Sequence, residues 1–137
     1  MSQEIALSVL AGQGSVSHAE IEAWLTTLVL NSVTSAHSRR SYQTGLAKFF
    51  LWTRCSGYAG HFSKAMVGEY RSHLLTLELS PASVNLRLSP IRRLAREMAD
   101  NQYLDPSVAA AIERVPGVER RGHRVGNWLT KKRPTNS

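Results

Sequence analysis

Apolar side chains recur every three or four residues through most of this chain, whereas strict alternation of polar and apolar residues is hard to find. The first spacing is typical of an amphipathic helix and the second of a β-strand. The sequence therefore predicts an all-α fold, a compact bundle of four to five short helices. The expected helices cover residues 17–30, 36–56, 63–78, 81–101 and 106–115.

Several expected helices begin at recognisable capping residues. Ser17 stands three residues before Glu20, which is the spacing of a capping box. The pairs Ser80-Pro81 and Asp105-Pro106 each combine an N-cap residue with a proline at the first helical position. These signals place the starts of three helices, and Gly57 is expected just past the end of the second helix.

Pro90 falls inside the fourth expected helix. A proline there removes one backbone hydrogen bond and crowds the preceding turn. We therefore expect a kink, or a split into pieces covering 81–89 and 90–101.

The apolar face of each helix is expected to form the core. The expected core residues are Ile21, Trp24, Leu25, Leu28, Tyr42, Leu46, Phe49, Phe50, Thr53, Met66, Val67, Tyr70, Leu74, Leu77, Val84, Leu88, Ile91, Leu94, Ala95, Met98, Val108 and Ile112.

Basic residues dominate the chain and are unevenly distributed. The 137 residues carry 17 Lys and Arg against 10 Asp and Glu, a net charge of +7, yet residues 1–37 contain no Lys or Arg. A small basic domain favours a polyanionic partner. We expect a flexible lead-in over 1–16, a DNA-binding domain over 17–117 and a basic linker over 118–137.

Other classes of protein find little support. No apolar run approaches the roughly 18 residues of a membrane span, and the N-terminus lacks the pattern of a secretory signal. The histidines lack zinc-protease spacing, no phosphate-binding loop occurs, and Cys55 is the single cysteine. We expect a cytoplasmic protein with no catalytic residue, metal, cofactor, small-molecule substrate or membrane partner.

Two polar, basic helix faces are the main functional signal. Asn85, Ser89, Arg92 and Arg96 follow an i, i+4, i+7, i+11 pattern, so they form one stripe. A helix with short polar side chains can enter the major groove, while Arg and Lys reach the phosphates. The candidate residues for binding double-stranded DNA are Arg39, Arg40, Ser41, Thr44, Lys48, Ser83, Asn85, Leu86, Arg87, Ser89, Arg92, Arg93, Arg96, Arg120, Arg121 and Arg124.

Two stretches of the chain resemble a known family. The stretch Ser35-Ala-His-Ser38, followed by Tyr42, Leu46, Phe49 and Trp52, resembles a signature of the N-terminal core-binding (SAM-like) domain of tyrosine recombinases, or phage integrases. The stretch from Leu79 to Leu94 is similar to a later helix of that domain, although Pro90 departs from the usual small residue.

The resemblance implies a helical domain that forms one jaw of a clamp around DNA, with two helices in the major groove. The other jaw, the catalytic domain, is expected to be absent from this chain, so no strand cleavage is expected from it. Further recombinase protomers on the DNA and a nucleoid-associated location are also implied.

Two alternatives remain open. The same faces could bind an acidic protein partner or mediate self-association. The short junction at Glu78-Leu-Ser-Pro-Ala82 could also belong to a free-standing helix-turn-helix regulator.

Overall fold

The structure, a computed structural model, describes residues 17–119 and contains five helices in that range, with no strand. They are α2 (His18–Leu30), α3 (Ala36–Cys55), α4 (Lys64–Thr76), α5 (Pro81–Asp100) and α6 (Pro106–Glu113). The predicted all-α fold is confirmed, and every predicted helix end lies within two residues of the observed one.

The predicted capping residues are where the helices begin. The Ser17 side chain accepts a hydrogen bond from the Glu20 amide at 3.2 Å, and the Glu20 carboxylate accepts one from the Ser17 amide at 3.0 Å. Ser80 and Asp105 are the N-caps of α5 and α6. Gly57, just past the end of α3, has φ of +82°, the left-handed conformation that glycine adopts at little cost.

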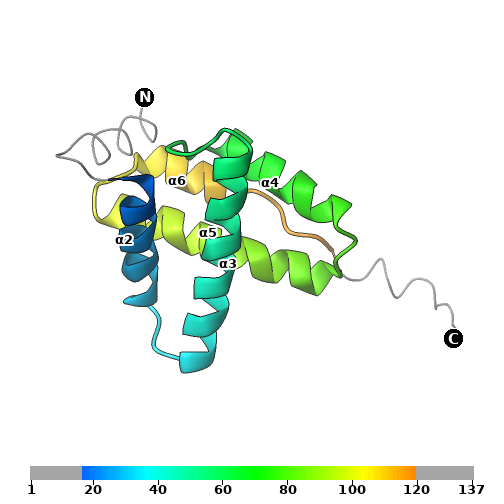
Figure 1. Ribbon diagram of the computed structural model, residues 1–137, viewed down its shortest axis with the longest axis horizontal. Coiled ribbons are helices and arrows are strands. Elements are labelled where there is room, and N and C mark those ends of the chain that lie inside the picture. The colour runs from blue at the N-terminus through cyan, green and yellow to red at the C-terminus, as the bar shows by residue number, and fades with distance from the viewer. Residues whose placement is uncertain (1–16, 120–137) are drawn as a thin grey trace, which may run out of the picture.

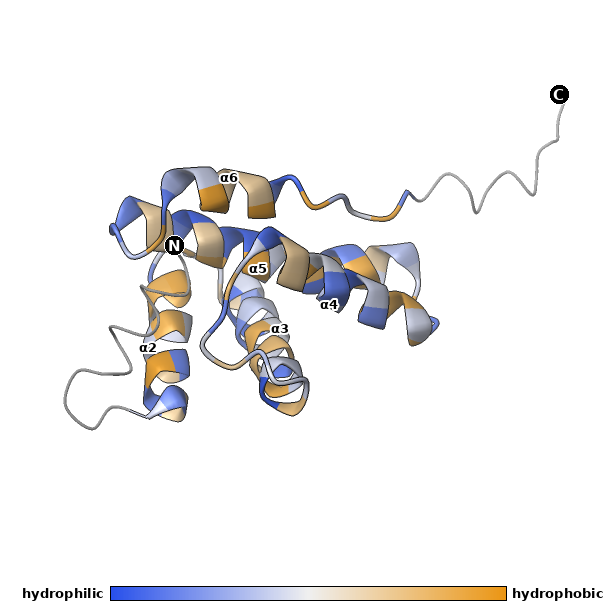
Figure 2. Cartoon of the chain, turned by 90° about the horizontal axis from the view of Figure 1, so that it is seen from above, coloured by the Kyte–Doolittle hydropathy of each residue, from blue (hydrophilic) through white to orange (hydrophobic). Residues whose placement is uncertain are grey.

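Helix α5 is the centre of the bundle and contacts each of the other four helices. In Figure 1 it runs across the molecule, α3 crosses it, and α2 lies alongside α3. Helix α6 packs against α5 and leads into the last described residues. Figure 2 shows apolar and hydrophilic residues side by side on each helix, the amphipathic pattern on which the prediction rested.

Two residues predicted for the core are exposed. Trp24 is 38 % exposed because Ile21, Leu25 and Val29 form the inward stripe of α2, which leaves Trp24 at the edge of that stripe. Its ring stands nearly perpendicular to that of Tyr103, with the ring centroids 4.9 Å apart. Leu77 is 46 % exposed because α4 ends at Thr76, so the helical spacing from Leu74 is not continued.

Of the two outcomes expected at Pro90, a kink or a split, the split of α5 is wrong. The helix continues from Pro81 to Asp100 as one element, and the Pro90 ring is buried inside the fold. A Cβ atom built on Gly45 of α3 would lie only 2.8 Å from Pro90 Cγ. The ring therefore fills the contact between α3 and α5, and this packing holds the helix together although one backbone hydrogen bond is lost.

Candidate nucleic-acid interface

A shallow groove of about 290 Å³ lies between α3 and α5. We call it the α3–α5 groove. It brings together five of the predicted residues from two helices, and none of its lining residues is acidic. The lining residues are His37, Arg40, Ser41, Thr44, Gly45, Leu86 and Arg87.

The contact between Gly45 and Pro90 positions this groove. Glycine at 45 allows the two helices to approach closely. Ser41 lies one turn before Gly45, and Leu86 lies one turn before Pro90, so both line the groove next to the contact. Leu86 is 56 % exposed, which makes it an apolar side chain at the surface of an otherwise polar groove.

Arg87 of the groove lies next to Tyr70 of the core. The Tyr70 ring is buried in the core, where burial raises the pKa of its hydroxyl above the usual value. The charge of Arg87 and its hydrogen bond with Tyr70 offset only part of this rise. The buried Tyr70 hydroxyl therefore lies beside a guanidinium that lines the groove.

A second basic hollow, of about 230 Å³, lies on the other side of the Gly45–Pro90 contact. We call it the arginine hollow. Three arginines of α5 line it together with residues from α3 and α6. The lining residues are Tyr42, Ser89, Arg92, Arg93, Arg96 and Glu113.

Each arginine of the hollow also connects α5 to a neighbouring segment. Arg92 Nη2 donates to the Val115 carbonyl at 2.6 Å, and Arg96 Nη2 pairs with Glu113 Oε1 at 2.9 Å. Arg93 donates to the hydroxyl and the carbonyl of Ser32, in the α2–α3 connection, at 3.0 and 2.9 Å. The arginine side chains are thus partly ordered by the fold before any ligand is present.

Asn85 and Ser89 continue the predicted polar stripe on α5, but the structure gives both of them partners within the protein. The Asn85 amide group bonds to the backbone of Val118 in both directions. Ser89 Oγ donates to the Asn85 carbonyl at 3.1 Å. Val118, the first residue of the predicted linker, is therefore bound to α5.

The remaining predicted residues are placed elsewhere. Arg39 Nη1 donates to the carbonyls of Leu30 and Val33. The Ser83 hydroxyl accepts a hydrogen bond from the Ser80 hydroxyl at the start of α5. Lys48 is exposed and lines neither the groove nor the hollow. Arg120, Arg121 and Arg124 lie outside the described residues.

The candidate list omitted four lining residues, of which Gly45 forms the helix contact described above. His37 stands four residues before Ser41, so it continues a stripe that the sequence already showed. Tyr42 was assigned to the core, and it both packs against the core and lines the hollow. Glu113 lies on α6, and no spacing rule connects it to α5.

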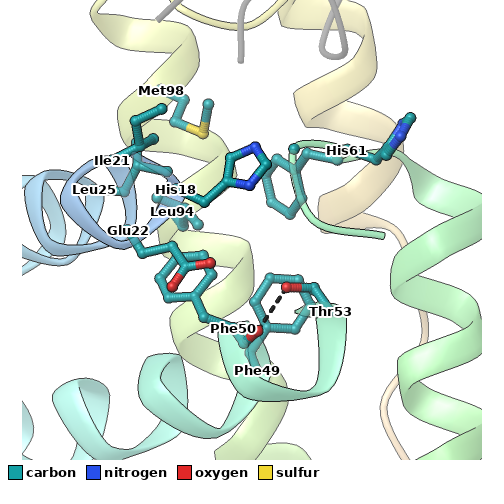
Figure 3. A pocket seen from close by; sticks show the side chains of 12 residues that line it. His18, Ile21, Glu22, Leu25, Phe49, Phe50, Thr53, His61, Leu94 and Met98 are labelled. Atoms are coloured by element: carbon teal, nitrogen blue, oxygen red, sulfur yellow. Dashed lines mark hydrogen bonds between the residues drawn. The ribbon is translucent and has the colours of Figure 1, made fainter. Parts of the chain in front are cut away.

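Within residues 17–119, an interior cavity differs in character from these two basic sites. This narrow cavity of about 30 Å³ lies between α2, α3, α5 and the loop after α3. Figure 3 shows its walls, which are mostly apolar, with the Thr53 hydroxyl bonded to the Phe50 carbonyl at 2.7 Å. Within residues 17–119, no three His, Cys, Asp or Glu side chains gather as a metal site would require. No helix in that part of the chain is both long and apolar enough to span a bilayer.

Comparison with known proteins identifies the family. The family model described as phage integrase, N-terminal SAM-like domain, matches residues 21–102. Neither the curated proteins nor the solved structures gave a match. The matched range contains most of α2, the whole of α3 to α5 and every residue of the α3–α5 groove. The chain therefore belongs to the family of phage integrase N-terminal SAM-like domains, whose role is connected with DNA binding in recombinases.

Proposed function

We propose that this domain binds duplex DNA as the core-binding module of a site-specific tyrosine recombinase. The α3–α5 groove is the observation that carries the proposal. It combines basic and short polar side chains from two helices without a single carboxylate.

The chemistry of the groove divides into two kinds of contact. Ser41 and Thr44 have short polar side chains, which let a helix backbone come close to base edges in the major groove. Arg40 and Arg87 are long enough to reach phosphates beside the bases. Leu86 adds an exposed apolar group that suits the methyl group of a thymine.

The other predicted residues take supporting positions in this proposal. Lys48, Arg120, Arg121 and Arg124 remain predicted phosphate contacts. Arg39 and Ser83 order the start of α3 and of α5, because their polar groups are bonded to neighbouring segments. Asn85 can contact a base only when its bonds to Val118 open.

We assign no strand cleavage to this domain. None of the tyrosines, Tyr42, Tyr58, Tyr70 and Tyr103, stands in the motif of the recombinase nucleophile. Cleavage is the task of a separate catalytic domain in the proposed recombinase. Other protomers on the same DNA are its proposed partners, in the cytoplasm at the nucleoid.

The test is binding of the full chain to a labelled duplex of random sequence, measured by fluorescence anisotropy over a salt series. If about five basic groups neutralise phosphates, log K falls with log salt with a slope of about −4 to −5. One jaw of a clamp lacks the contacts of the other, so we expect dissociation constants near the micromolar, non-specific range.

Single variants locate the interface. Arg40→Gln and Arg87→Gln should each weaken binding to all sequences and reduce the magnitude of the slope by about 1. Arg54→Gln is the matched control, because it makes the same charge change at the other end of α3, where Arg54 pairs with Glu22. Ser41→Ala should instead change the preference among sequences by roughly 1–3 kcal/mol.

The outcome also decides between this proposal and its alternatives. Absence of binding at low salt, or equal effects of the Arg54 and Arg87 variants, contradicts the groove assignment. A protein-interaction module would then be the better description. A free-standing helix-turn-helix regulator would bind tightly to one sequence without any other domain.

A further inference from the structure

We propose that residues 116–118 form an autoinhibitory strap, which covers Asn85 in the free domain and opens when duplex DNA binds. This inference rests on the proposed function and deepens it, because it assigns a regulatory contact to the face of the domain on which DNA binding is proposed.

The strap is held through its backbone by side chains of two helices. Arg71 of α4 donates hydrogen bonds to the carbonyls of Pro116 and Gly117. Asn85 of α5 donates to the Val118 carbonyl at 3.0 Å and accepts from the Val118 amide at 2.8 Å. All three carbonyls of the strap therefore accept a bond from α4 or α5.

The strap occupies the groups with which an asparagine recognises a base. Asparagine identifies an adenine in the major groove by donating to its N7 atom and accepting from its N6 amino group. Val118 presents the same pair of groups, an accepting carbonyl and a donating amide, to the side chain of Asn85. The strap thus imitates the edge of a base, so strap and DNA compete for Asn85.

Asn85 lies beside the surface where DNA binding is proposed. Leu86, the next residue of α5, lines the α3–α5 groove and is exposed. Asn85 itself is only partly exposed because the strap lies against it. A duplex in the groove would therefore come close to Asn85 and meet the strap.

Glycine at position 117 lets the strap approach α5 this closely. A Cβ atom built on Gly117 would lie 2.4 Å from Asn85 Oδ1 and 3.2 Å from Asn85 Cγ. A side chain at position 117 would therefore push the strap away from α5 and leave the chemistry of Asn85 unchanged.

The strap can open while the domain stays folded. Val115, the preceding residue, is 3 % exposed, and its carbonyl accepts a hydrogen bond from Arg92. Val115 anchors the segment, whereas the three strap residues are exposed or partly exposed. Opening breaks the bonds to Arg71 and Asn85 and separates Val118 from the edge of the core, which is a local change.

A closed strap lowers the apparent affinity for DNA, because only the open fraction of molecules can use Asn85. DNA favours the open form to the extent that it binds that form more tightly. Weakening the strap should therefore strengthen DNA binding, whereas the loss of a merely structural contact should not.

Two variants open the strap without changing a predicted DNA contact. Arg71→Gln removes both bonds to the strap together with one positive charge, so a charge effect alone would weaken binding. Gly117→Ala inserts a methyl group against Asn85, and Gly68→Ala is its control because no atom lies near the new Cβ. For the full chain and a pool of random-sequence duplexes at low salt, we expect both strap variants to bind about three- to tenfold more tightly.

A second substitution shows whether the gain acts through Asn85. In an Asn85→Ala background, Gly117→Ala should leave the affinity for DNA unchanged, because the group that the strap covers is absent. Sequencing of the retained duplexes should show a stronger sequence preference for Gly117→Ala than for the unchanged chain. A gain that persists without Asn85 would overturn the proposal.

Hydrogen exchange at the Val118 amide follows the strap directly. In the unchanged chain, DNA should accelerate exchange at this amide, because opening breaks its bond to Asn85. Slower or unchanged exchange in the complex would show that the strap stays closed on DNA.

The results separate this inference from the proposed function. If Arg40→Gln and Arg87→Gln weaken DNA binding while neither strap variant strengthens it, the strap is only structural and the groove assignment stands. If the strap variants strengthen binding and the Arg40 and Arg87 variants have no effect, the groove assignment fails and the strap remains supported. If the chain binds no duplex at low salt, both proposals fail.

Discussion

Asn85 and Val118 exchange two hydrogen bonds that join the middle of the bundle to the chain beyond α6. Asn85 Nδ2 donates to the Val118 carbonyl at 3.0 Å, and the Val118 amide donates to Asn85 Oδ1 at 2.8 Å. Arg71 of α4 donates to the carbonyls of Pro116 and Gly117 at 2.8 and 3.2 Å. The path of the chain after α6 is thus fixed by side chains of two helices.

Removing the Asn85 amide should release this segment. We expect Asn85→Ala to lower the free energy of unfolding by about 1–2 kcal/mol, because two partly buried hydrogen bonds are lost. Hydrogen exchange at the Val118 amide should become faster, whereas amides in the middle of α3 should be affected only through global stability. Unchanged protection of Val118 in the variant would show that the two bonds do not hold the segment.

A side chain at Gly45 should disturb the packing of α3 on α5. Gly45→Ala places a Cβ 2.8 Å from Pro90 Cγ, and overpacking of this kind costs about 1–3 kcal/mol. Gly68→Ala is the matched control, because no atom lies within 4 Å of its new Cβ and alanine favours the helix by up to about 1 kcal/mol. Denaturant unfolding of both variants checks the contrast, and equal stabilities would refute the close contact.

Helix α3 should be sensitive to substitution at buried Phe49 and tolerant at exposed Leu51, two residues later on its outer face. Phe49 is 1 % exposed, and Phe49→Ala should cost about 3–5 kcal/mol. Leu51 on the same helix is 55 % exposed, so Leu51→Ala should change stability by less than about 0.5 kcal/mol. Thermal melts of the two variants distinguish buried from exposed positions on α3, and a similar loss for both would mean that its faces are misassigned.

The N-cap of α6 should give stability that depends on pH. The hydroxyl and the amide of Ser107 donate to Asp105 Oδ1 at 2.7 and 2.8 Å, and these bonds lower the pKa of Asp105. A carboxylate whose pKa is lower in the folded state stabilises the fold above its unfolded pKa. That contribution is lost as the pH falls through the folded pKa.

We therefore expect Asp105→Ala to lower the melting temperature at pH 7 and to have a smaller effect near pH 2. Ser107→Ala is the companion variant, because it removes the hydroxyl bond while the carboxylate remains. The measurement is a series of thermal melts between pH 2 and pH 7. An Asp105→Ala effect that is independent of pH would contradict a role for the charged carboxylate.

Local signals explain how well the helices could be predicted. Capping residues act through bonds to amides two or three residues away, so Ser17, Ser80 and Asp105 are recognisable from neighbouring residues alone. The inward faces of α3 and α5 were also predictable, because the spacing of apolar residues within one helix determines which of them share a face. The prediction failed at Trp24 because this residue lies at the edge of the inward stripe of α2, and at Leu77 because α4 ends one residue before it.

The candidate site was harder to predict because it depends on contacts between segments distant in the sequence. The i, i+4 pattern correctly placed Asn85, Ser89, Arg92 and Arg96 on one stripe. It could not show that α6 and the segment up to Val118 pack along that stripe and bond to Asn85 and Arg92. Arg40 and Ser41 line the same groove as Arg87 because α3 crosses α5 at Gly45. The spacing of residues within one helix does not reveal that crossing.

The Gly45–Pro90 contact also restricts the order in which the two positions can change during evolution. Exchanging Pro90 for alanine first removes the ring and leaves space, after which a methyl group at 45 can be accepted. The reverse order passes through an intermediate in which the new Cβ meets the ring at 2.8 Å. Of the two mutational routes to the same pair, one is therefore open and the other is obstructed, so residue 90 decides which substitutions residue 45 can accept.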